Sequence, residues 1–333
     1  MIKKLESSDI LIPCMKKERF DLDTKTTLAP YVDINYAEAD YDETKQFFEN
    51  QLLIARTSMG LAHCIHHDLV SRLMVYFGDS IEAKENVFSK KYNEITGGWT
   101  GIKRADECTL IDNKLNGMKK WITNIHNSSY VNLQILDENK VSKSVYVDLT
   151  KSEHEITFAN FTPLGMELAI PGSIIFKNIE IKPDQILGLN TSPQFFLKNN
   201  FHSYCFLTNH LGVTRQLFLD LKAYTDKFDC GAEFDIKKLE TDVCTMQMQW
   251  EDNLISLKQR DSTNEFWHRR NTQYSFSKKT LISIIQMIIE VGVSYWANKE
   301  GDYSQRFRDA LTYSSHMYPL YRFSQLYNFL ELK

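Results

Sequence analysis

Hydrophobic positions in the first quarter of the chain recur with the period of helices. Between Asp42, an expected N-cap, and Met59, the apolar residues fall on one helix face: Phe47, Phe48, Leu52 and Ala55. Further helices are expected over residues 61–77 and 80–91. Residues 1–37 show no clear period and predict a short entry segment and loops. The pattern therefore predicts an N-terminal helical domain over residues 1–91.

From residue 92 onward the apolar residues alternate with polar ones, which is the period of strands. The run Val145-Tyr146-Val147-Asp148-Leu149 is an example, and glycine, asparagine and proline separate such runs. Asn116-Gly117 predicts a two-residue hairpin turn, because both residue types tolerate positive φ. We expect a middle β domain over residues 92–190.

Helical periodicity returns at about residue 192. One seam repeats at alternating spacings of four and three: Leu207, Leu211, Thr214, Phe218 and Leu221. Three more helices are expected over residues 232–260, 277–299 and 304–330. Residues 191–333 thus predict a four-helix bundle, and the whole chain an α+β fold in which helices and strands are segregated.

Composition excludes some classes of partner. The chain has 333 residues, 43% of them hydrophobic, and a formal net charge of −4. It has no basic stripe, so we expect no nucleic-acid binding. The most apolar segment, residues 281–293, carries Gln286 and Glu290 and is too short to cross a bilayer. No signal-peptide pattern opens the chain, so we expect a cytoplasmic protein without membrane contact, whose six scattered cysteines are free thiols.

One helical segment has the spacing of a metal-binding pair. His63 and His67 lie four residues apart, on one face of the helix expected over residues 61–77. Zinc requires three or four ligands, and no third ligand stands at a matching spacing. The sequence therefore predicts no metal site.

Residues 115–124 read Leu-Asn-Gly-Met-Lys-Lys-Trp-Ile-Thr-Asn. This segment resembles the flavin-contacting hairpin of the acyl-CoA dehydrogenase family. Residues 164–166 and 173–183 are similar to the closing strand of that family's middle domain, and 209–213 and 308–310 to parts of its C-terminal bundle. The resemblance runs from about residue 60 to the C-terminus. It implies an acyl-CoA dehydrogenase-like fold of N-terminal helices (shortened), a middle β domain and a C-terminal four-helix bundle.

The resemblance implies FAD as cofactor. Trp121 would lie against the flavin ring, and Thr123 would bond near the nitrogen that receives hydride. The family's phosphate-contacting segment is not preserved, and Gly97 and Gly98 are the nearest candidates for a close approach to phosphate.

Two further cofactor contacts depart from the family pattern in the bundle. Lys227 takes the place of an arginine that holds the adenosine half of the cofactor. Of a Gly-Gly pair that admits a neighbouring subunit's pyrophosphate, Gly292 alone remains.

Dehydrogenation of a thioester also needs a base for the α-proton and donors for the thioester oxygen. Met317 stands where most members of the family have the catalytic glutamate, and it cannot accept a proton. His316 is next to that position, and His202 occupies the position that some members use instead. A histidine near its ordinary pKa is a usable base, so both are candidate catalytic residues.

The function implied is that of the flavin-dependent acyl-thioester oxidoreductase lineage, acting on acyl-CoA or an acyl group on a carrier protein. Because several contacts are missing together, we expect a degraded active site with reduced or absent dehydrogenase activity. Two alternatives stay open, a flavin monooxygenase of the same fold and a flavin-less, non-redox paralogue. Family members share each cofactor between subunits, so we expect a homo-oligomer (dimer or tetramer) or a heteromer with an intact relative.

Overall fold

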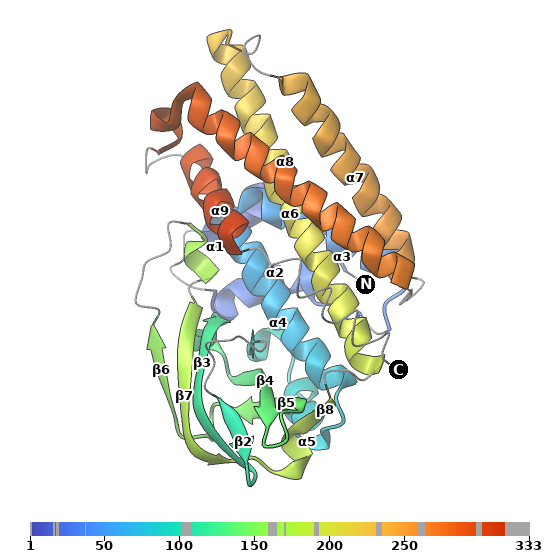
Figure 1. Ribbon diagram of the computed structural model, residues 1–333, viewed down its shortest axis with the longest axis vertical. Helices are drawn as coiled ribbons and strands as arrows, with labels where there is room; N and C mark the ends of the chain where they lie inside the picture. Colours follow the sequence, from blue (N-terminus) through green and yellow to red (C-terminus); the bar gives the residue numbers. More distant parts are fainter. Residues whose placement is uncertain are drawn as a thin grey trace. The chain divides into compact units, whose positions relative to one another are not determined.

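The computed structural model (Figure 1) describes most of the chain. The described residues are 2–15, 17, 20–36, 38–100, 108–158, 165–169, 171–189, 193–230, 235–258, 264–297 and 302–316. Helices come first, a sheet follows, and long helices close the chain, so the predicted α+β order is confirmed.

In the described part of the chain, five α-helices precede the sheet: α1 (Leu11–Met15), α2 (Leu22–Val32), α3 (Tyr41–Thr57), α4 (Met59–Phe77) and α5 (Ile81–Phe88). The expectation of loops over residues 1–37 was wrong, because that region contains α1 and α2. Asp21 caps α2 by accepting a hydrogen bond from the Thr24 N–H at 2.8 Å. The periodicity was obscured because α2 buries Lys25 and carries Pro30 in its last turn.

The helix predicted from Asp42 begins slightly earlier. Asp40 is the N-cap of α3, and its side chain accepts a hydrogen bond from the Glu43 N–H at 2.8 Å. Ser80 caps α5 in the same way, through the Ala83 N–H at 2.9 Å. Both caps are short polar side chains of the kind that satisfies the first free N–H groups of a helix.

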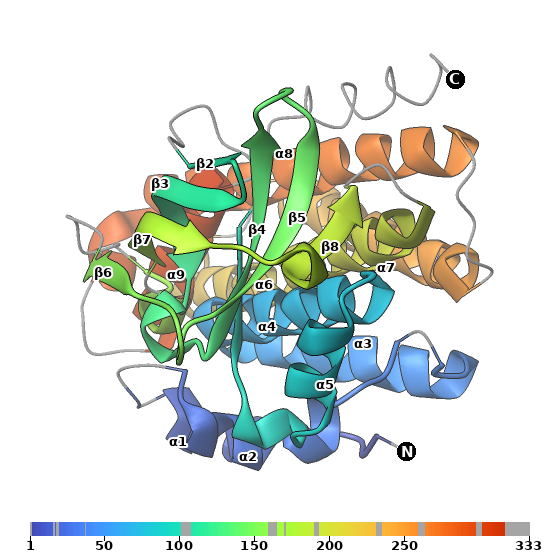
Figure 2. The same ribbon diagram turned by 90° about the horizontal axis from the view of Figure 1, so that it is seen from below.

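The sheet is mixed, and the described residues contribute eight strands to it: β1 (Gly97–Thr100), β2 (Thr109–Ile111), β3 (Lys114–Thr123), β4 (Tyr130–Asp137), β5 (Ser142–Asp148), β6 (His154–Phe158), β7 (Pro171–Glu180) and β8 (Ile186–Leu189). Along the main path the strand order is β6-β7-β3-β2-β4-β5-β8, and β1 pairs with β4 in parallel. Figure 2 shows β4 and β5 side by side; they form a long antiparallel pair from Tyr130↔Asp148 to Leu136↔Ser142.

The hairpin turn lies elsewhere than predicted. Asp112 and Asn113, with φ of 48° and 59°, connect β2 to β3. Asn116-Gly117 lies inside β3, where the pairing with β7 shifts register between Leu115 and Gly117. Gly117 has φ of 104°, so this glycine allows a bulge in β3 and does not form the turn.

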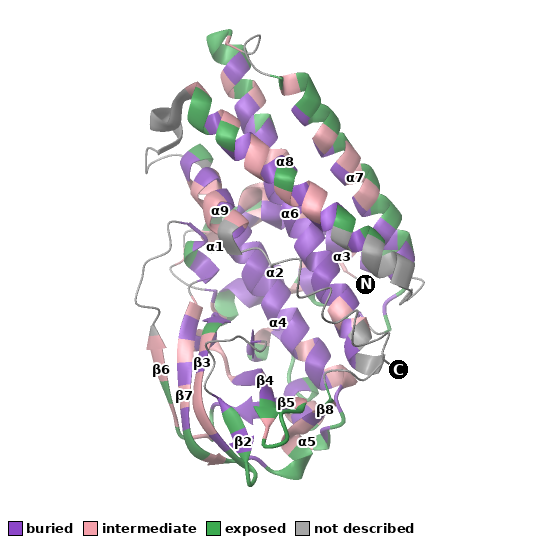
Figure 3. Ribbon diagram, in the orientation of Figure 1, coloured by how far each residue is buried: buried purple, intermediate pink, exposed green. Residues whose placement is uncertain are grey.

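The strand predicted over Val145–Leu149 is confirmed as β5, although burial does not alternate along it, since Tyr146 and Asp148 are buried as well. Leu133, Ile135, Val145 and Val147 are all fully buried in one apolar cluster with Phe176 of β7. In Figure 3 most of β4 is coloured as buried.

Up to residue 316, where the described part of the chain ends, four helices follow the sheet: α6 (Pro193–Phe228), α7 (Ile236–Lys258), α8 (Asn264–Ala297) and α9 (Asp302–His316). The predicted seam of α6 is confirmed, since Leu207, Leu211, Thr214, Phe218 and Leu221 are all buried. The helix predicted over 277–299 begins earlier, at Asn264. The part of the last predicted helix beyond residue 316 lies outside the described residues.

The chain divides into two compact units. Unit 1 comprises residues 1–39, 63–162 and 167–202, and unit 2 comprises 40–62, 163–166 and 203–333. The whole sheet belongs to unit 1. The three-domain division of the sequence therefore stays a prediction. All six cysteines are free thiols, as expected, and no helix among the described residues is both long and apolar enough to span a membrane.

Candidate functional site

The candidate site in unit 1 is built on one face of α4. This helix is buried along most of its length, so its polar side chains have to find partners inside the protein. His63, His66 and His67 stand at positions i, i+3 and i+4 and therefore share a face. All three are buried, and His202 of α6 joins them in the same unit. We call these four residues the histidine cluster.

The rings of the histidine cluster are in close contact. The ring centroids of His63 and His67 are 4.2 Å apart, and those of His66 and His67 are 5.0 Å apart. His202 lies 4.6 Å from His66 and 5.9 Å from His67 by the same measure. One ring nitrogen of each α4 histidine lies within 4.8 Å of the corresponding nitrogens of the other two.

His66 and His202 are hydrogen-bonded to each other. His66 Nε2 and His202 Nδ1 are 2.6 Å apart, so one nitrogen donates and the other accepts. Burial lowers the pKa of His66 well below its ordinary value, and the neighbouring His202 and His63 add to this effect. His66 is therefore a neutral imidazole at neutral pH.

Trp99 and Lys198 lie beside the cluster. The Trp99 ring, on β1, is 4.7 Å from the His202 ring and 5.5 Å from the His67 ring between centroids. Its indole N–H is buried and has no acceptor within the described part of the chain. Lys198 Nζ lies 5.2 Å from the Trp99 centroid, and burial lowers the pKa of Lys198 to about 7.

A buried ion pair stands one residue further along α4. Lys25 Nζ of α2 lies 2.8 Å from Asp68 Oδ2, and both side chains are inaccessible to solvent. The Lys25 ammonium also donates to the Ile95 carbonyl and lies 4.1 Å from the Tyr92 ring centroid. Burial lowers the pKa of Lys25, although Asp68 acts in the opposite direction. The pair ties α2 to α4.

The same helix also fixes the start of the sheet. Asp68 Oδ1 accepts a hydrogen bond from the Gly97 N–H at 2.8 Å, and the Ser71 hydroxyl donates to the Gly98 carbonyl at 2.9 Å. The amide of Asn132 on β4 donates to the Ser71 carbonyl at 2.7 Å. These bonds hold β1, and with it Trp99, against the histidine face of α4.

Cys64 is next to His63 in sequence but has a different environment. Its thiol lies 3.2 Å from the Leu168 carbonyl, and burial raises its pKa. It therefore stays protonated and is a poor metal ligand or nucleophile.

The predicted flavin contacts Trp121 and Thr123 lie at the end of β3. Trp121 has φ of 63° and sits where the pairing with β7 shifts register between Lys119 and Ile122. Its side chain is 40% exposed, whereas Thr123 is buried. An exposed aromatic ring held by a bulge fits contact with a flat cofactor ring.

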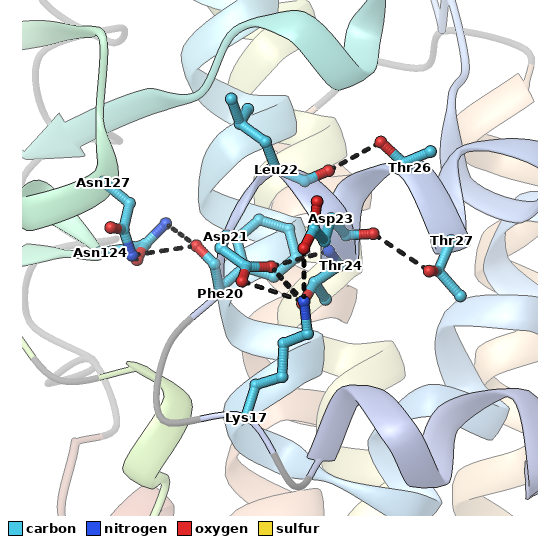
Figure 4. Close-up of polar contacts among 10 residues, drawn as sticks. All are labelled: Lys17, Phe20, Asp21, Leu22, Asp23, Thr24, Thr26, Thr27, Asn124 and Asn127. Carbon is cyan, nitrogen blue, oxygen red and sulfur yellow. Dashed lines mark hydrogen bonds and ion pairs between the residues drawn. The ribbon is translucent and has the colours of Figure 1, made fainter.

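Asn124, the last residue of the resembling segment, has a structural role. Its side-chain amide donates to the Phe20 carbonyl at 3.0 Å, and the amide of Asn127 donates to the same oxygen at 3.2 Å (Figure 4). Asn124 itself has φ of 56°, which asparagine tolerates better than most residues. The end of β3 is thus attached to the segment that precedes α2.

Gly97 and Gly98, the suggested phosphate contacts, are closely packed on the side where a Cβ would lie. The Gly97 N–H is already bonded to Asp68, and a Cβ there would meet Tyr130 and the Ser71 hydroxyl at about 2.5 Å. A Cβ on Gly98 would come within 3.1 Å of the Ser128 hydroxyl. A side chain at Gly97 would therefore clash with Tyr130, and the phosphate contact of the two glycines stays a prediction.

The remaining predicted site residues belong to unit 2. Lys227 is exposed near the end of α6, with its Nζ 5.2 Å from the Phe228 ring centroid. Gly292 lies in α8 and His316 is the last residue of α9; the surroundings of both lie outside the described side chains. The structure therefore places Gly97, Gly98, Trp121, Thr123 and His202 in unit 1 and Lys227, Gly292 and His316 in unit 2.

Sequence reasoning missed His66, Trp99 and Lys198. The spacing of His66 from His63 is itself a helical i, i+3 spacing, so His66 could have been found from the pattern. Lys198 and His202 are likewise four residues apart on one helix. No local pattern relates α4 to α6, because His66 and His202 are 136 residues apart.

Comparison with solved structures gives the fold. No family model and no curated protein sequence matches the chain. The structure is similar to that of butyryl-CoA dehydrogenase from Megasphaera elsdenii, with a TM-score of 0.74 and 12% identity over 99% of this chain and 100% of that one.

Two other similar structures belong to a second dehydrogenase and to a monooxygenase. A glutaryl-coenzyme A dehydrogenase in complex with glutaryl-CoA has a TM-score of 0.67 and 16% identity, over 93% of this chain and 92% of that one. Dibenzothiophene monooxygenase from Paenibacillus sp. A11-2 has a TM-score of 0.68 and 15% identity, over 87% and 84%. The chain thus has the acyl-CoA dehydrogenase fold, and the predicted fold class is confirmed.

Proposed function

We propose that this chain is an acyl-CoA dehydrogenase-like flavoprotein of the acyl-thioester oxidoreductase lineage, with reduced or absent dehydrogenase activity. It would act on acyl-CoA or on an acyl group delivered by a carrier protein. The observation that carries the proposal is the surroundings of His202, which is buried against Trp99 and bonded to another imidazole at 2.6 Å. The fold and the exposed ring of Trp121 support a flavin site.

The donors that a thioester oxygen needs have candidates beside His202. Trp99 offers a buried N–H without an acceptor in the described part of the chain, and Lys198 an amine near the same ring. Such donors suit a thioester oxygen that becomes negatively charged when the α-proton leaves. A bound flavin would accept the hydride from the β-carbon.

Whether His202 can act as the base depends on which of its ring nitrogens carries the hydrogen. If His202 Nδ1 donates to His66, the lone pair of the His202 ring lies on Nε2, as a base requires. If His66 donates instead, His202 Nε2 carries the hydrogen and cannot act as a base. Only one of two tautomers is therefore competent, which is why we propose reduced or absent activity.

The first test is the visible absorbance of the purified protein before and after addition of FAD and, separately, FMN. We expect a flavin band that persists through gel filtration and weakens in Trp121→Ala. Anaerobic addition of acyl-CoA should bleach it slowly or not at all. Phe228→Ala, which removes an exposed ring in unit 2, is a matched control.

The outcomes separate the alternatives. A colourless protein that takes up neither flavin would contradict the proposal for the isolated chain and favour the non-redox subunit of a heteromer. A flavin band that is not bleached by acyl-CoA but consumes oxygen when reduced would favour a monooxygenase. Exchange of the acyl α-proton, compared between wild type, His202→Gln and His316→Gln, reports whether either histidine is the base.

A further inference from the structure

We propose that His63, His66 and His67 of α4 form a binding site for a divalent transition-metal ion of the Zn²⁺ type, and that His202 positions His66 within it. The site is independent of flavin. It replaces the expectation from sequence that the pair His63 and His67 has no third ligand, because His66 supplies one.

The geometry of the three α4 histidines matches a three-nitrogen site. Their ligand nitrogens all lie within 4.8 Å of one another. Metal–nitrogen bonds of about 2.0–2.1 Å at tetrahedral angles place such nitrogens about 3.3 Å apart. Side-chain rotations that move each nitrogen by about 1 Å therefore close the site, and neighbouring positions on one helix face allow them.

The spacing of the rings leads to the same conclusion. In a tetrahedral site of imidazoles, ring centroids lie about 5 Å apart, given the same bond length and the size of the ring. Here the three centroid distances are 4.2 Å, 5.0 Å and 6.1 Å. Their mean is close to the expected value, so the three rings are about as far apart as in such a site.

His202 acts on this site through His66. A histidine that binds a metal through one ring nitrogen usually donates the N–H of the other to a hydrogen-bond acceptor, which fixes the ring and its tautomer. His66 Nε2 lies 2.6 Å from His202 Nδ1, so in the proposed site His66 would bind the metal through Nδ1. His202 is therefore a positioning residue, and in the metal-bound form its own Nε2 carries a hydrogen.

The surroundings select the kind of ion. An all-imidazole set suits Zn²⁺, Co²⁺, Ni²⁺ or Cu²⁺, whereas Mg²⁺ and Ca²⁺ require oxygen ligands. Cys64 is directed to the Leu168 carbonyl and does not add a thiolate. Asp68 is neutralised by Lys25, so the fourth position is left for water, hydroxide or another anion that offsets part of the charge.

The test measures metal binding directly and needs neither flavin nor activity. Protein made without a polyhistidine tag is stripped with chelator, dialysed against Zn²⁺ or Co²⁺ and analysed by elemental mass spectrometry. We expect one equivalent per chain. His63→Gln, His66→Gln and His67→Gln should each lower the affinity more than about 100-fold, and His202→Gln about 10- to 100-fold without changing the stoichiometry.

His154→Gln is the matched control, because His154 lies on β6 in the same unit and outside the cluster. Its variant should bind metal like wild type. Equal binding by wild type and by all three α4 variants would overturn the proposal, as would no binding by wild type. If a variant fails to fold, the Co²⁺ spectrum of wild type decides: nitrogen and oxygen ligation without a thiolate band supports the site, and a thiolate band overturns it.

Failure of this proposal is distinguishable from failure of the proposed function. Flavin uptake is read from the visible band of the metal-free protein, and metal content from the flavin-free protein. Each measurement can succeed or fail without the other.

Discussion

At the scale of single residues, Lys198 in unit 1 is a buried lysine whose pKa is strongly lowered. A lysine in water has a pKa of 10.5, and burial lowers that of Lys198 to about 7. The folded protein therefore disfavours the charged form relative to the unfolded chain. Its aromatic neighbours Trp99 and Phe195 offset only part of the loss of hydration.

Substitution of Lys198 by methionine should stabilise the protein at neutral pH. Above pH 10.5 the lysine is neutral in both states and has no effect. As the pH falls towards 7 the unfolded chain takes up a proton that the folded chain does not, so stability decreases, by up to about 5 kcal/mol for the difference between 10.5 and about 7. Lys198→Met should raise the melting temperature at pH 7 and lose its advantage towards pH 10.

Thermal denaturation between pH 6 and 10 measures this effect. Lys279→Met, which changes an exposed lysine on α8, serves as the control and should not alter the pH profile. A Lys198→Met protein that melts at or below the wild-type temperature at pH 7 would show that the ammonium has polar partners in the folded state.

At the scale of elements, the pair Lys25–Asp68 joins α2 and α4 and, through the Gly97 N–H, β1. A buried ion pair contributes little net stability against an apolar pair, but loss of one partner leaves an uncompensated charge. Lys25→Met should therefore destabilise the protein by about 3–5 kcal/mol. The double variant Lys25→Met/Asp68→Asn should lose less than the sum of the two single variants, because the second substitution removes the charge that the first leaves unpaired.

Urea denaturation of the four proteins in this double-mutant cycle gives the coupling free energy. The exposed pair Lys238–Asp242 on α7 offers a matched control, and Lys238→Met should change stability by less than about 1 kcal/mol. Additive effects at Lys25 and Asp68 would contradict the assigned pairing.

Elements were predictable from sequence where a local pattern determined them. The seam of α6 needed only the repeat of Leu207, Leu211 and Phe218, and all three are buried. The turn between β2 and β3 was misplaced, because Asn-Gly is a stronger local signal than Asp112-Asn113, yet the pairing with β7 uses Gly117 for a bulge. Helix α2 was missed because tertiary partners, Asp68 and Tyr92, allow it to bury Lys25.

At the scale of the whole molecule, the fold could be inferred from a few short segments, although identity to the similar structures is only 10–16%. The residues that surround His202 in the candidate site could not be inferred from the sequence. His202 was found as a single position, and its partner His66 comes from a helix 136 residues away in sequence. The need for glycine at position 97 also depends on a distant residue, Tyr130, which a Cβ there would meet at 2.5 Å.

The two units should nevertheless unfold together. Helices α4 and α6 are continuous across the divisions at residues 62/63 and 202/203, so unfolding one unit requires a helix of the other to be broken. His210 is a useful probe in unit 2, because burial between the rings of Tyr274 and Tyr313 lowers its pKa to about 3. As the pH falls from 6.5 towards 3 the unfolded chain gains a proton that the folded one does not, and stability decreases.

We therefore expect calorimetry to show one transition, with equal calorimetric and van't Hoff enthalpies. At pH 4.5, His210→Phe should move that whole transition to higher temperature, since phenylalanine fits between two aromatic rings and does not titrate. Lys198→Met, in unit 1, should move the same transition at pH 7. Two peaks, of which only one responds to each substitution, would show that the units are independent, and a metal bound to the histidine cluster would then raise the peak of unit 1 alone.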